Sequence, residues 1–186
     1  MRAMRAPVES PLLTAEDVEL LSIPDKRVEL VRGRLIVREP PGPWHGSVQA
    51  SICYALIAWV RPRNLGIVTG EAGFKVEVSP DTVRGPDVAF ISAARLPGVP
   101  RRGFPAFAPD VAVEIVSPGD RAGEIMDKVG QWLGGGARLV WVVDTQRTEA
   151  RVFRADGSVS IVRGDENLGG EDVLPGFEVP LADVLK

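Results

Sequence analysis

Apolar and polar positions follow two periods along this chain, and the first is helical. Between residues 44 and 60 the apolar side chains recur three or four positions apart, as they do on one face of a helix. They are Val48, Ile52, Ala55, Leu56 and Trp59. A similar pattern covers residues 123–133 and stops at a run of three glycines. The pattern predicts two helices, each with one buried face.

The second period is two, the period of a β-strand. Residues 110–116 alternate so that apolar side chains lie on one side while Glu114 lies on the other, among small or apolar neighbours. Residues 137–143 are almost entirely apolar, which favours a strand that is covered on both faces.

Shorter signals complete the predicted order of elements. Thr14 can cap a short helix, because Asp17 stands where a capping box needs it. The pairs Arg32-Gly33 and Asp156-Gly157 favour two β-hairpins. The remaining strands are expected at residues 27–31, 34–38, 65–69, 73–78, 87–91, 151–155 and 158–163, a long loop at 93–109, and a short docking segment around Phe177.

These elements predict an α/β fold with a central mixed β-sheet flanked by helices, and with β-hairpins added at the N-terminal and C-terminal ends. A chain of 186 residues fits one compact domain, and no linker divides it, so we expect a single domain over residues 1–186.

Composition narrows the class of protein. Cys53 is the one cysteine, so no disulfide can form within the chain and a reducing compartment is expected. The basic residues 1–5 are not followed by an apolar segment of signal-peptide length, and no run of about 18 apolar residues occurs. We therefore expect a cytoplasmic protein with no membrane partner. A net charge of −3 is not typical of a general nucleic-acid-coating protein, although arginine dominates the basic residues and favours phosphate contacts.

Two acidic residues on consecutive predicted strands are the candidate chemistry. Asp87 opens one strand, Glu114 lies near the end of the next, and Lys128 follows on a helix. Neighbouring strands lie about 5 Å apart, so the two carboxylates can meet. Two carboxylates can hold Mg²⁺ or Mn²⁺ with its remaining waters, and a lysine nearby can stabilise the charge that develops during phosphodiester hydrolysis.

Each of these residues also has an ordinary structural interpretation. Asp87 can end a turn or pair with Arg84, and Lys128 is typical of any exposed helix. Glu114 favours function more strongly, because a carboxylate among apolar neighbours is costly to bury without a metal or a cation. Since two neighbouring anions repel, we also expect Glu114→Gln without metal to melt no lower than wild type.

Seven segments carry a resemblance to known proteins. In chain order they are Glu29-Leu-Val-Arg-Gly33, His45, Gly85-Pro-Asp87, Val113-Glu-Ile-Val-Ser-Pro118, Lys128, Leu139-Val-Trp-Val-Val-Asp144 and Leu174-Pro-Gly-Phe177. Their order resembles the PD-(D/E)XK nuclease superfamily, the fold of type II restriction endonucleases. The chain is similar, over about residues 18–185, to a large bacterial family of restriction-endonuclease-like proteins without an assigned function.

The resemblance implies a restriction-endonuclease-like fold and a set of site residues. Asp87, Glu114 and the backbone carbonyl of Ile115 correspond to metal ligands, for Mg²⁺ or Mn²⁺. The catalytic lysine of the superfamily lies two positions after the glutamate, where this chain has Val116. In the narrower family the lysine lies on the following helix, which points to Lys128.

The resemblance also adds Glu29 and His45 to the candidate catalytic residues. It implies that Glu29 approaches the same cleft as a further acid, and the alternative is a salt bridge to Arg27 or Arg34. His45 is the one histidine of the chain, and the alternative for it is a capping or structural role at a helix start.

The implied activity is metal-dependent endonucleolytic hydrolysis of DNA, with a homodimer where both strands are cut, because one chain offers one active site. The loop at residues 95–107 interleaves arginines with Phe104 and Phe107, which suits either nucleic acid or a second subunit. Two alternatives remain at this point. The chain can be a non-catalytic nucleic-acid-binding or scaffold protein that retains the nuclease fold, or a phosphodiesterase that acts on a nucleotide.

Overall fold

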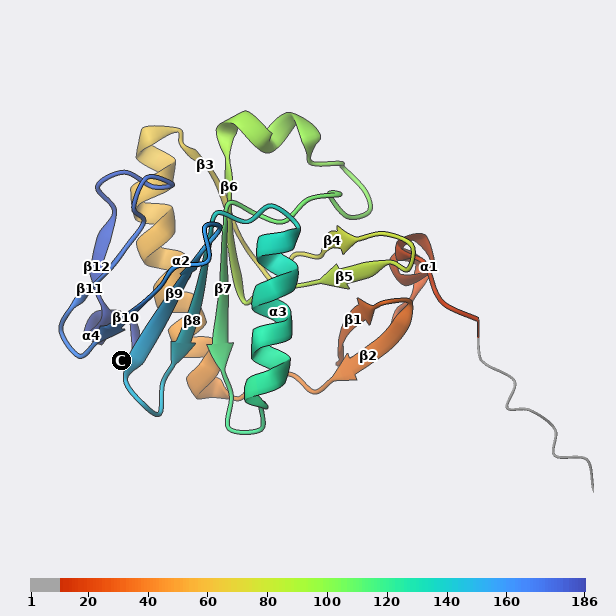
Figure 1. The fold of residues 1–186 in the computed structure, drawn as a ribbon, viewed down its shortest axis with the longest axis horizontal. Helices are drawn as coiled ribbons and strands as arrows, with labels where there is room; N and C mark the ends of the chain where they lie inside the picture. Colours follow the sequence, from red (N-terminus) through yellow and green to blue (C-terminus); the bar gives the residue numbers. More distant parts are fainter. Residues whose placement is uncertain (1–10) are drawn as a thin grey trace, which may run out of the picture.

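A computed structural model describes residues 11–186 (Figure 1). The basic N-terminal segment discussed above lies outside the described residues. Within residues 11–186, none of the helices is long and apolar enough to cross a membrane.

A six-stranded sheet forms the centre of the fold. In sheet order its strands are β10 (Val159–Arg163), β9 (Glu149–Arg154), β8 (Leu139–Asp144), β7 (Val111–Val116), β6 (Val88–Ser92) and β3 (Gly66–Gly70). β7 and β8 run parallel and the other neighbouring pairs run antiparallel, so the sheet is mixed as predicted. The predicted C-terminal hairpin is β9 and β10, and it extends this sheet.

Helices cover both faces of the central sheet (Figure 1). The helix α2 (Pro43–Val60) packs on one face and α3 (Ala122–Gly134) on the other. Alternate residues of β7 divide between these two cores, so that Val113 packs with α2 and Ala112 with α3. The strand β8 is buried on both faces. The predicted α/β class is therefore confirmed, and it follows from the two hydrophobic periods.

The N-terminal hairpin belongs to a second, four-stranded sheet. In sheet order its strands are β2 (Arg34–Arg38), β1 (Arg27–Val31), β5 (Thr82–Arg84) and β4 (Phe74–Glu77). The helix α1 (Ala15–Leu20) packs against this sheet, and its predicted capping box is present. The strand β5 was not predicted, because a strand of three residues is too short to show a period of two.

The C-terminal segment packs against the hydrophobic core that α2 covers. Two short strands, β11 (Asn167–Gly169) and β12 (Glu178–Pro180), pair with each other, and α4 (Leu181–Val184) follows. Phe177 lies between Trp141 and Trp59, with ring centroids 6.1 Å and 6.2 Å away. The predicted docking segment around Phe177 is thus confirmed, although its strands and helix were not predicted.

Short 3₁₀ turns complete the described elements. They are η1 (Arg61–Arg63) and η2 (Ala93–Gly98). The prediction of an uninterrupted loop at residues 93–109 was therefore wrong at its start, where Pro97 and Gly98 in the sequence suggested no regular structure.

One carboxylate joins α1 to the second sheet. Asp81 accepts hydrogen bonds from the backbone N–H of Ala15 at 2.9 Å and from the Lys75 ammonium at 2.8 Å. Burial acts to raise the pKa of Asp81, but Lys75 and the backbone donors outweigh burial, so the pKa lies below the ordinary 3.8. The stabilisation is therefore present above pH 3.8 and is lost as the pH falls through the lower, folded-state pKa.

We expect Asp81→Asn to lower the free energy of unfolding at neutral pH by about 1–3 kcal/mol, because a charged hydrogen-bond acceptor is lost. The difference from wild type should shrink at acid pH, where wild-type Asp81 is itself protonated. Urea denaturation at both pH values measures this. The control is Asp127→Asn, the same change at an exposed position of α3. Equal effects of the two variants at neutral pH would contradict the anchoring role.

Candidate functional site

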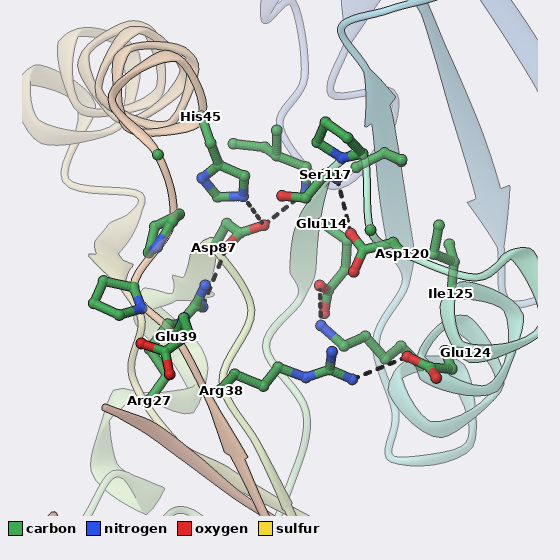
Figure 2. Close-up of a pocket in the computed structure, with 18 of the residues that line it drawn as sticks. Arg27, Arg38, Glu39, His45, Asp87, Glu114, Ser117, Asp120, Glu124 and Ile125 are labelled. Atoms are coloured by element: carbon green, nitrogen blue, oxygen red, sulfur yellow. Dashed lines mark hydrogen bonds and ion pairs between the residues drawn. The ribbon is translucent and has the colours of Figure 1, made fainter. Parts of the chain in front are cut away.

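A cavity of about 500 Å³ opens where the N-terminus of α2, the end of β7, the start of α3 and the β1–β2 hairpin meet (Figure 2). Its lining includes Asp87, Glu114, Ile115, His45 and Lys128. The structure thus brings together five of the six residues that the sequence analysis selected. The sixth, Glu29, lies in an adjoining cavity of about 260 Å³ that Lys128 also lines.

Asp87 is fastened to β7 on both sides of Glu114. Its backbone N–H donates to the carbonyl of Val113 at 2.9 Å, and its Oδ2 accepts the backbone N–H of Ile115 at 2.7 Å. The side chain of Gln49 also donates to the backbone carbonyl of Asp87 at 2.8 Å. The two bonds to β7 follow from the antiparallel pairing of β6 with β7, and the third comes from α2; together they fix Asp87 at the edge of the cavity.

Glu114 is held by two donors from one helix. Its Oε2 lies 2.6 Å from the Lys128 ammonium, and its Oε1 accepts the indole N–H of Trp132 at 2.8 Å. Lys128 and Trp132 stand four positions apart on α3, so both face the same point of β7. Glu114 is 6% exposed, and the structure therefore supplies the cation that its burial requires.

The pKa values of Asp87 and Glu114 are shifted in opposite directions. Burial acts to raise the pKa of Asp87, but His45, the Ile115 N–H and Arg27 outweigh it, and the pKa lies below its ordinary value. Burial raises the pKa of Glu114; Lys128 opposes this rise and the charge of Asp87 adds to it.

Lys128 keeps its proton. Burial acts to lower its pKa, but the charge of Glu114 outweighs burial and the pKa is raised. The ammonium of Lys128 lies 2.6 Å from the carboxylate of Glu114, the distance of an ionised pair.

His45 lies in the first turn of α2 and faces Asp87 (Figure 2). Its Nε2 is 3.3 Å from Asp87 Oδ2, and its side chain is 10% exposed. The hydrogen bond to Asp87 raises the pKa of His45, burial opposes this, and the charge of Asp87 and the Ile115 backbone contribute further. Among the described residues, Nδ1 has no hydrogen-bond partner.

Glu29 is paired, but not with the residues that the alternative interpretation proposed. It accepts a hydrogen bond from Arg84 at 2.9 Å, and Arg38 lies 3.9 Å away. The alternative of a salt bridge to Arg27 or Arg34 was therefore wrong, because β5, which carries Arg84, lies beside β1 in the second sheet. The alternative pairing of Asp87 with Arg84 was wrong for the same reason.

The donor set fits a hard cation that keeps much of its water. Within residues 11–186, no group of three or more His, Cys, Asp or Glu side chains is placed to hold a metal ion. Mg²⁺ needs fewer protein ligands, because it binds through one or two carboxylates together with waters and substrate phosphate. Asp87 and Glu114 offer two carboxylates whose oxygens retain free lone pairs. The carbonyl of Ile115 leaves the strand on the same side as its N–H, towards Asp87.

Four contributors to the site were missed by the sequence analysis. They are Trp132, Arg27 and Gln49, and a fourth, Arg38, also lines the cavity. The spacing of Lys128 and Trp132 was the available signal for the first, since residues four apart share a helix face. Arg27 stands two positions before Glu29, on the same face of β1. Gln49 gave no signal in the sequence.

The loop after β6 is packed more tightly than its sequence indicated. Arg95 lies 3.4 Å from Asp110, and its guanidinium stacks 4.3 Å from the ring centroid of Phe107. Phe104 packs against the second sheet. The phenylalanines therefore pack against the hydrophobic cores, while Arg101 and Arg102 remain exposed.

The mixed sheet between helices, with its acids gathered at one strand end, has the fold of a restriction-endonuclease-like protein. The sequence matches the Uma2 family, described as "Putative restriction endonuclease", over residues 15–182, and the chain belongs to this family. Its fold is similar to the crystal structure of "a putative nuclease belonging to DUF820" from Anabaena variabilis, with a TM-score of 0.80 and 18% identity over 93% of this chain and 97% of that chain. No curated protein matches the sequence.

The ion pair reverses one expectation about stability. Glu114→Gln was expected to melt no lower than wild type, on the argument that two anions repel. The structure pairs Glu114 with a Lys128 side chain that is 18% exposed. Removing one partner of a buried pair leaves an uncompensated charge, which costs about 3–5 kcal/mol and outweighs the relief of repulsion.

We therefore expect Glu114→Gln to lower the free energy of unfolding of the metal-free protein by a few kcal/mol. The double change Glu114→Gln with Lys128→Met should recover part of the loss, because it removes both charges. Chemical denaturation in the presence of a chelator measures both variants. A single variant as stable as wild type would show that the ion pair does not form in solution.

Proposed function

We propose that the protein is a Mg²⁺- or Mn²⁺-dependent endonuclease that hydrolyses phosphodiester bonds of DNA. The observation that supports it most directly is the meeting of Asp87, Glu114 and Lys128 at one end of β7, in a cavity open to solvent. The family and its structural relative, both described as nucleases, favour the same activity.

Asp87, Glu114 and the carbonyl of Ile115 would hold the cation. When bound, the cation polarises a phosphoryl oxygen and lowers the pKa of a water. Asp87 is suited to this role because its lowered pKa keeps it ionised at neutral pH. Trp132 and Lys128 limit the rotation of the Glu114 carboxylate, so its oxygens are oriented before any ligand arrives.

Lys128 would stabilise the negative charge of the transition state. Its raised pKa keeps the ammonium protonated, so it serves as a fixed positive charge and does not remove a proton from water. The position two residues after Glu114 is Val116, which carries no charge. Lys128 enters the same space from α3, which packs against β7.

We assign positioning roles to His45 and Glu29. His45 holds Oδ2 of Asp87 together with the Ile115 N–H, while Oδ1 accepts a hydrogen bond from Arg27. Glu29 neutralises Arg84 and raises the pKa of Lys128 through its charge. Both residues support the ionised state of groups that would contact metal or substrate.

The protein is proposed to act on DNA in the cytoplasm. For cleavage of both strands it is proposed to form a symmetric homodimer, because each chain carries one candidate site. Analytical ultracentrifugation of the free protein and of its complex with a DNA duplex measures the oligomeric state. A monomer that cuts both strands at one position would contradict the dimer.

We expect Mn²⁺-dependent cleavage of plasmid or single-stranded DNA by the wild type. Asp87→Ala should abolish cleavage, and Lys128→Ala should slow it by about 10²-fold or more, as the loss of a preorganised charge typically does. The double variant Val116→Lys with Lys128→Ala should recover activity, because it returns the charge to the strand. Lys186→Ala, a charge change at an exposed residue outside the cavity, is the matched control.

Time courses under single-turnover conditions, with folding checked by circular dichroism, give these rates. Equal rates for wild type and Lys128→Ala would exclude Lys128 as the catalytic cation. A wild type that binds DNA but cuts no substrate with either metal would favour the non-catalytic binding protein. Cleavage confined to mononucleotide diesters would favour the small-substrate phosphodiesterase.

A further inference from the structure

Two arginines face each other at the open end of the β1–β2 hairpin. Arg27 and Arg38 are directly opposite in the antiparallel register, so their side chains project from the same face of the sheet. Like charges in this arrangement destabilise a hairpin. Both side chains line the cavity that holds the two carboxylates. A local cost of this kind at the edge of a candidate site indicates that the pair serves the site.

Each arginine is held by carboxylates of the cavity. Arg27 Nη2 lies 3.1 Å from Asp87 Oδ1, and Arg38 Nη2 lies 3.1 Å from Glu124 (Figure 2). The side chains remain 27% and 37% exposed. Among the described residues, the buried Nε of Arg38 has no hydrogen-bond partner; its nearest acid, Glu29, lies 3.9 Å away. The pair therefore has donors left over for another acceptor.

The contact of Arg27 involves the oxygen of Asp87 that a cation would use. Oδ2 already lies against the Ile115 N–H and His45. Oδ1 faces Arg27, which is its one partner among the described residues. A divalent cation bound through Oδ1 must therefore share that oxygen with the guanidinium or displace it.

The balance of charge points in the same direction. In the structure Arg27 neutralises Asp87, and Lys128 neutralises Glu114. A divalent cation that competes for Oδ1 takes from Arg27 the carboxylate to which it is hydrogen-bonded, and a partly buried guanidinium without an acceptor is unfavourable. A phosphodiester anion supplies a new acceptor, because a guanidinium can bind it with two parallel hydrogen bonds.

We propose that Arg27 and Arg38 form a phosphate clamp. In the free protein the carboxylates of the site hold the two arginines, and the divalent cation and a DNA phosphate together free the arginines from these carboxylates. The inference rests on the proposed function and adds to it a phosphate-binding pair and an order of events. A cation held by Asp87 would compete with Arg27 for Oδ1, and Arg27 would then be free to bind a phosphate oxygen beside Arg38. Cation and DNA therefore strengthen each other's binding, and by thermodynamic linkage they do so by the same factor.

Two measurements test this without relying on cleavage. Calorimetry with Mn²⁺ gives the cation affinity of the free protein. Fluorescence anisotropy of a short labelled DNA duplex, with a chelator or with Ca²⁺, gives the DNA affinity and its dependence on an oxygen-binding cation. Gel electrophoresis of each sample confirms that the duplex is intact.

The variants are Arg27→Gln, Arg27→Lys and Arg38→Gln. The matched control is Arg34→Gln, the same change at an exposed residue at the turn end of the same hairpin. We expect Arg27→Gln to bind Mn²⁺ more tightly than wild type when no DNA is present, because the competing charge is gone. Its DNA affinity should gain little from Ca²⁺, whereas wild type should gain by a factor of roughly 5–150, the usual range of such coupling.

The other variants separate charge from geometry. Arg27→Lys should keep the weak Mn²⁺ binding of wild type but lose DNA affinity, since an ammonium competes for Asp87 yet lacks the two-pronged contact with phosphate. Arg38→Gln should weaken DNA binding and leave Mn²⁺ affinity close to that of wild type. Thermal melts establish that each variant is folded.

Two results would overturn the clamp, and they differ from failure of the proposed function. If Arg27→Gln matches Arg34→Gln in both measurements while wild type binds Mn²⁺ and DNA, the clamp is wrong and the nuclease proposal stands. If the wild type gains no DNA affinity from Ca²⁺, the coupling does not exist. A wild type that binds neither Mn²⁺ nor DNA would remove the clamp together with the function on which it rests.

Discussion

The constraint on which the site depends is the burial of two carboxylates side by side at the end of β7. A buried carboxylate is tolerated only when cations and hydrogen-bond donors compensate it. Asp87 receives them from β1, from α2 and from the backbone of β7, and Glu114 receives them from α3. These contacts join the two helices and the two sheets to one point. The arrangement of the cavity therefore follows from the need to neutralise two acids.

The second sheet also helps to compensate the two buried carboxylates. The β1–β2 hairpin is fixed by its pairing with β5, and β5 leads through Pro86 to Asp87. The hairpin therefore lines the cavity together with α3 (Figure 2). From there it contributes Arg27 and Arg38, while Glu29 turns to Arg84 of β5. The predicted N-terminal hairpin is thus one wall of the site.

Compensation by protein cations also explains how the two buried carboxylates lie together at the end of β7. The described part of the chain lacks a group of three acidic or histidine ligands, yet its two carboxylates are oriented and have lone pairs to spare. The two carboxylates are compensated by protein cations, because Arg27 and Lys128 supply positive charge. In the proposed function, waters and a phosphate would complete the coordination of a cation at the two carboxylates.

Much of the fold was predictable from the sequence alone. The spacing of apolar residues located α2 and α3, and alternation in β7 placed Glu114 on the face opposite Val113 and Ile115. The apolar neighbours of Glu114 marked that acid, and Asp87 was a candidate because it opens the preceding predicted strand. These features were accessible because they depend on neighbours within a few residues, and the period of a helix or strand is a local property.

Only the tertiary structure decided the partners of the charged residues. Arg84 reaches Glu29 across 55 positions, and Arg27 reaches Asp87 across 60. Such pairs are set by which strands lie side by side, and β5, the strand that joins the hairpin to Asp87, was too short to predict. The sequence by itself therefore determined the class of fold and the two acids. The counter-ions that give those acids their protonation states, and the wall that faces them, depend on long-range strand pairing that no local period encodes.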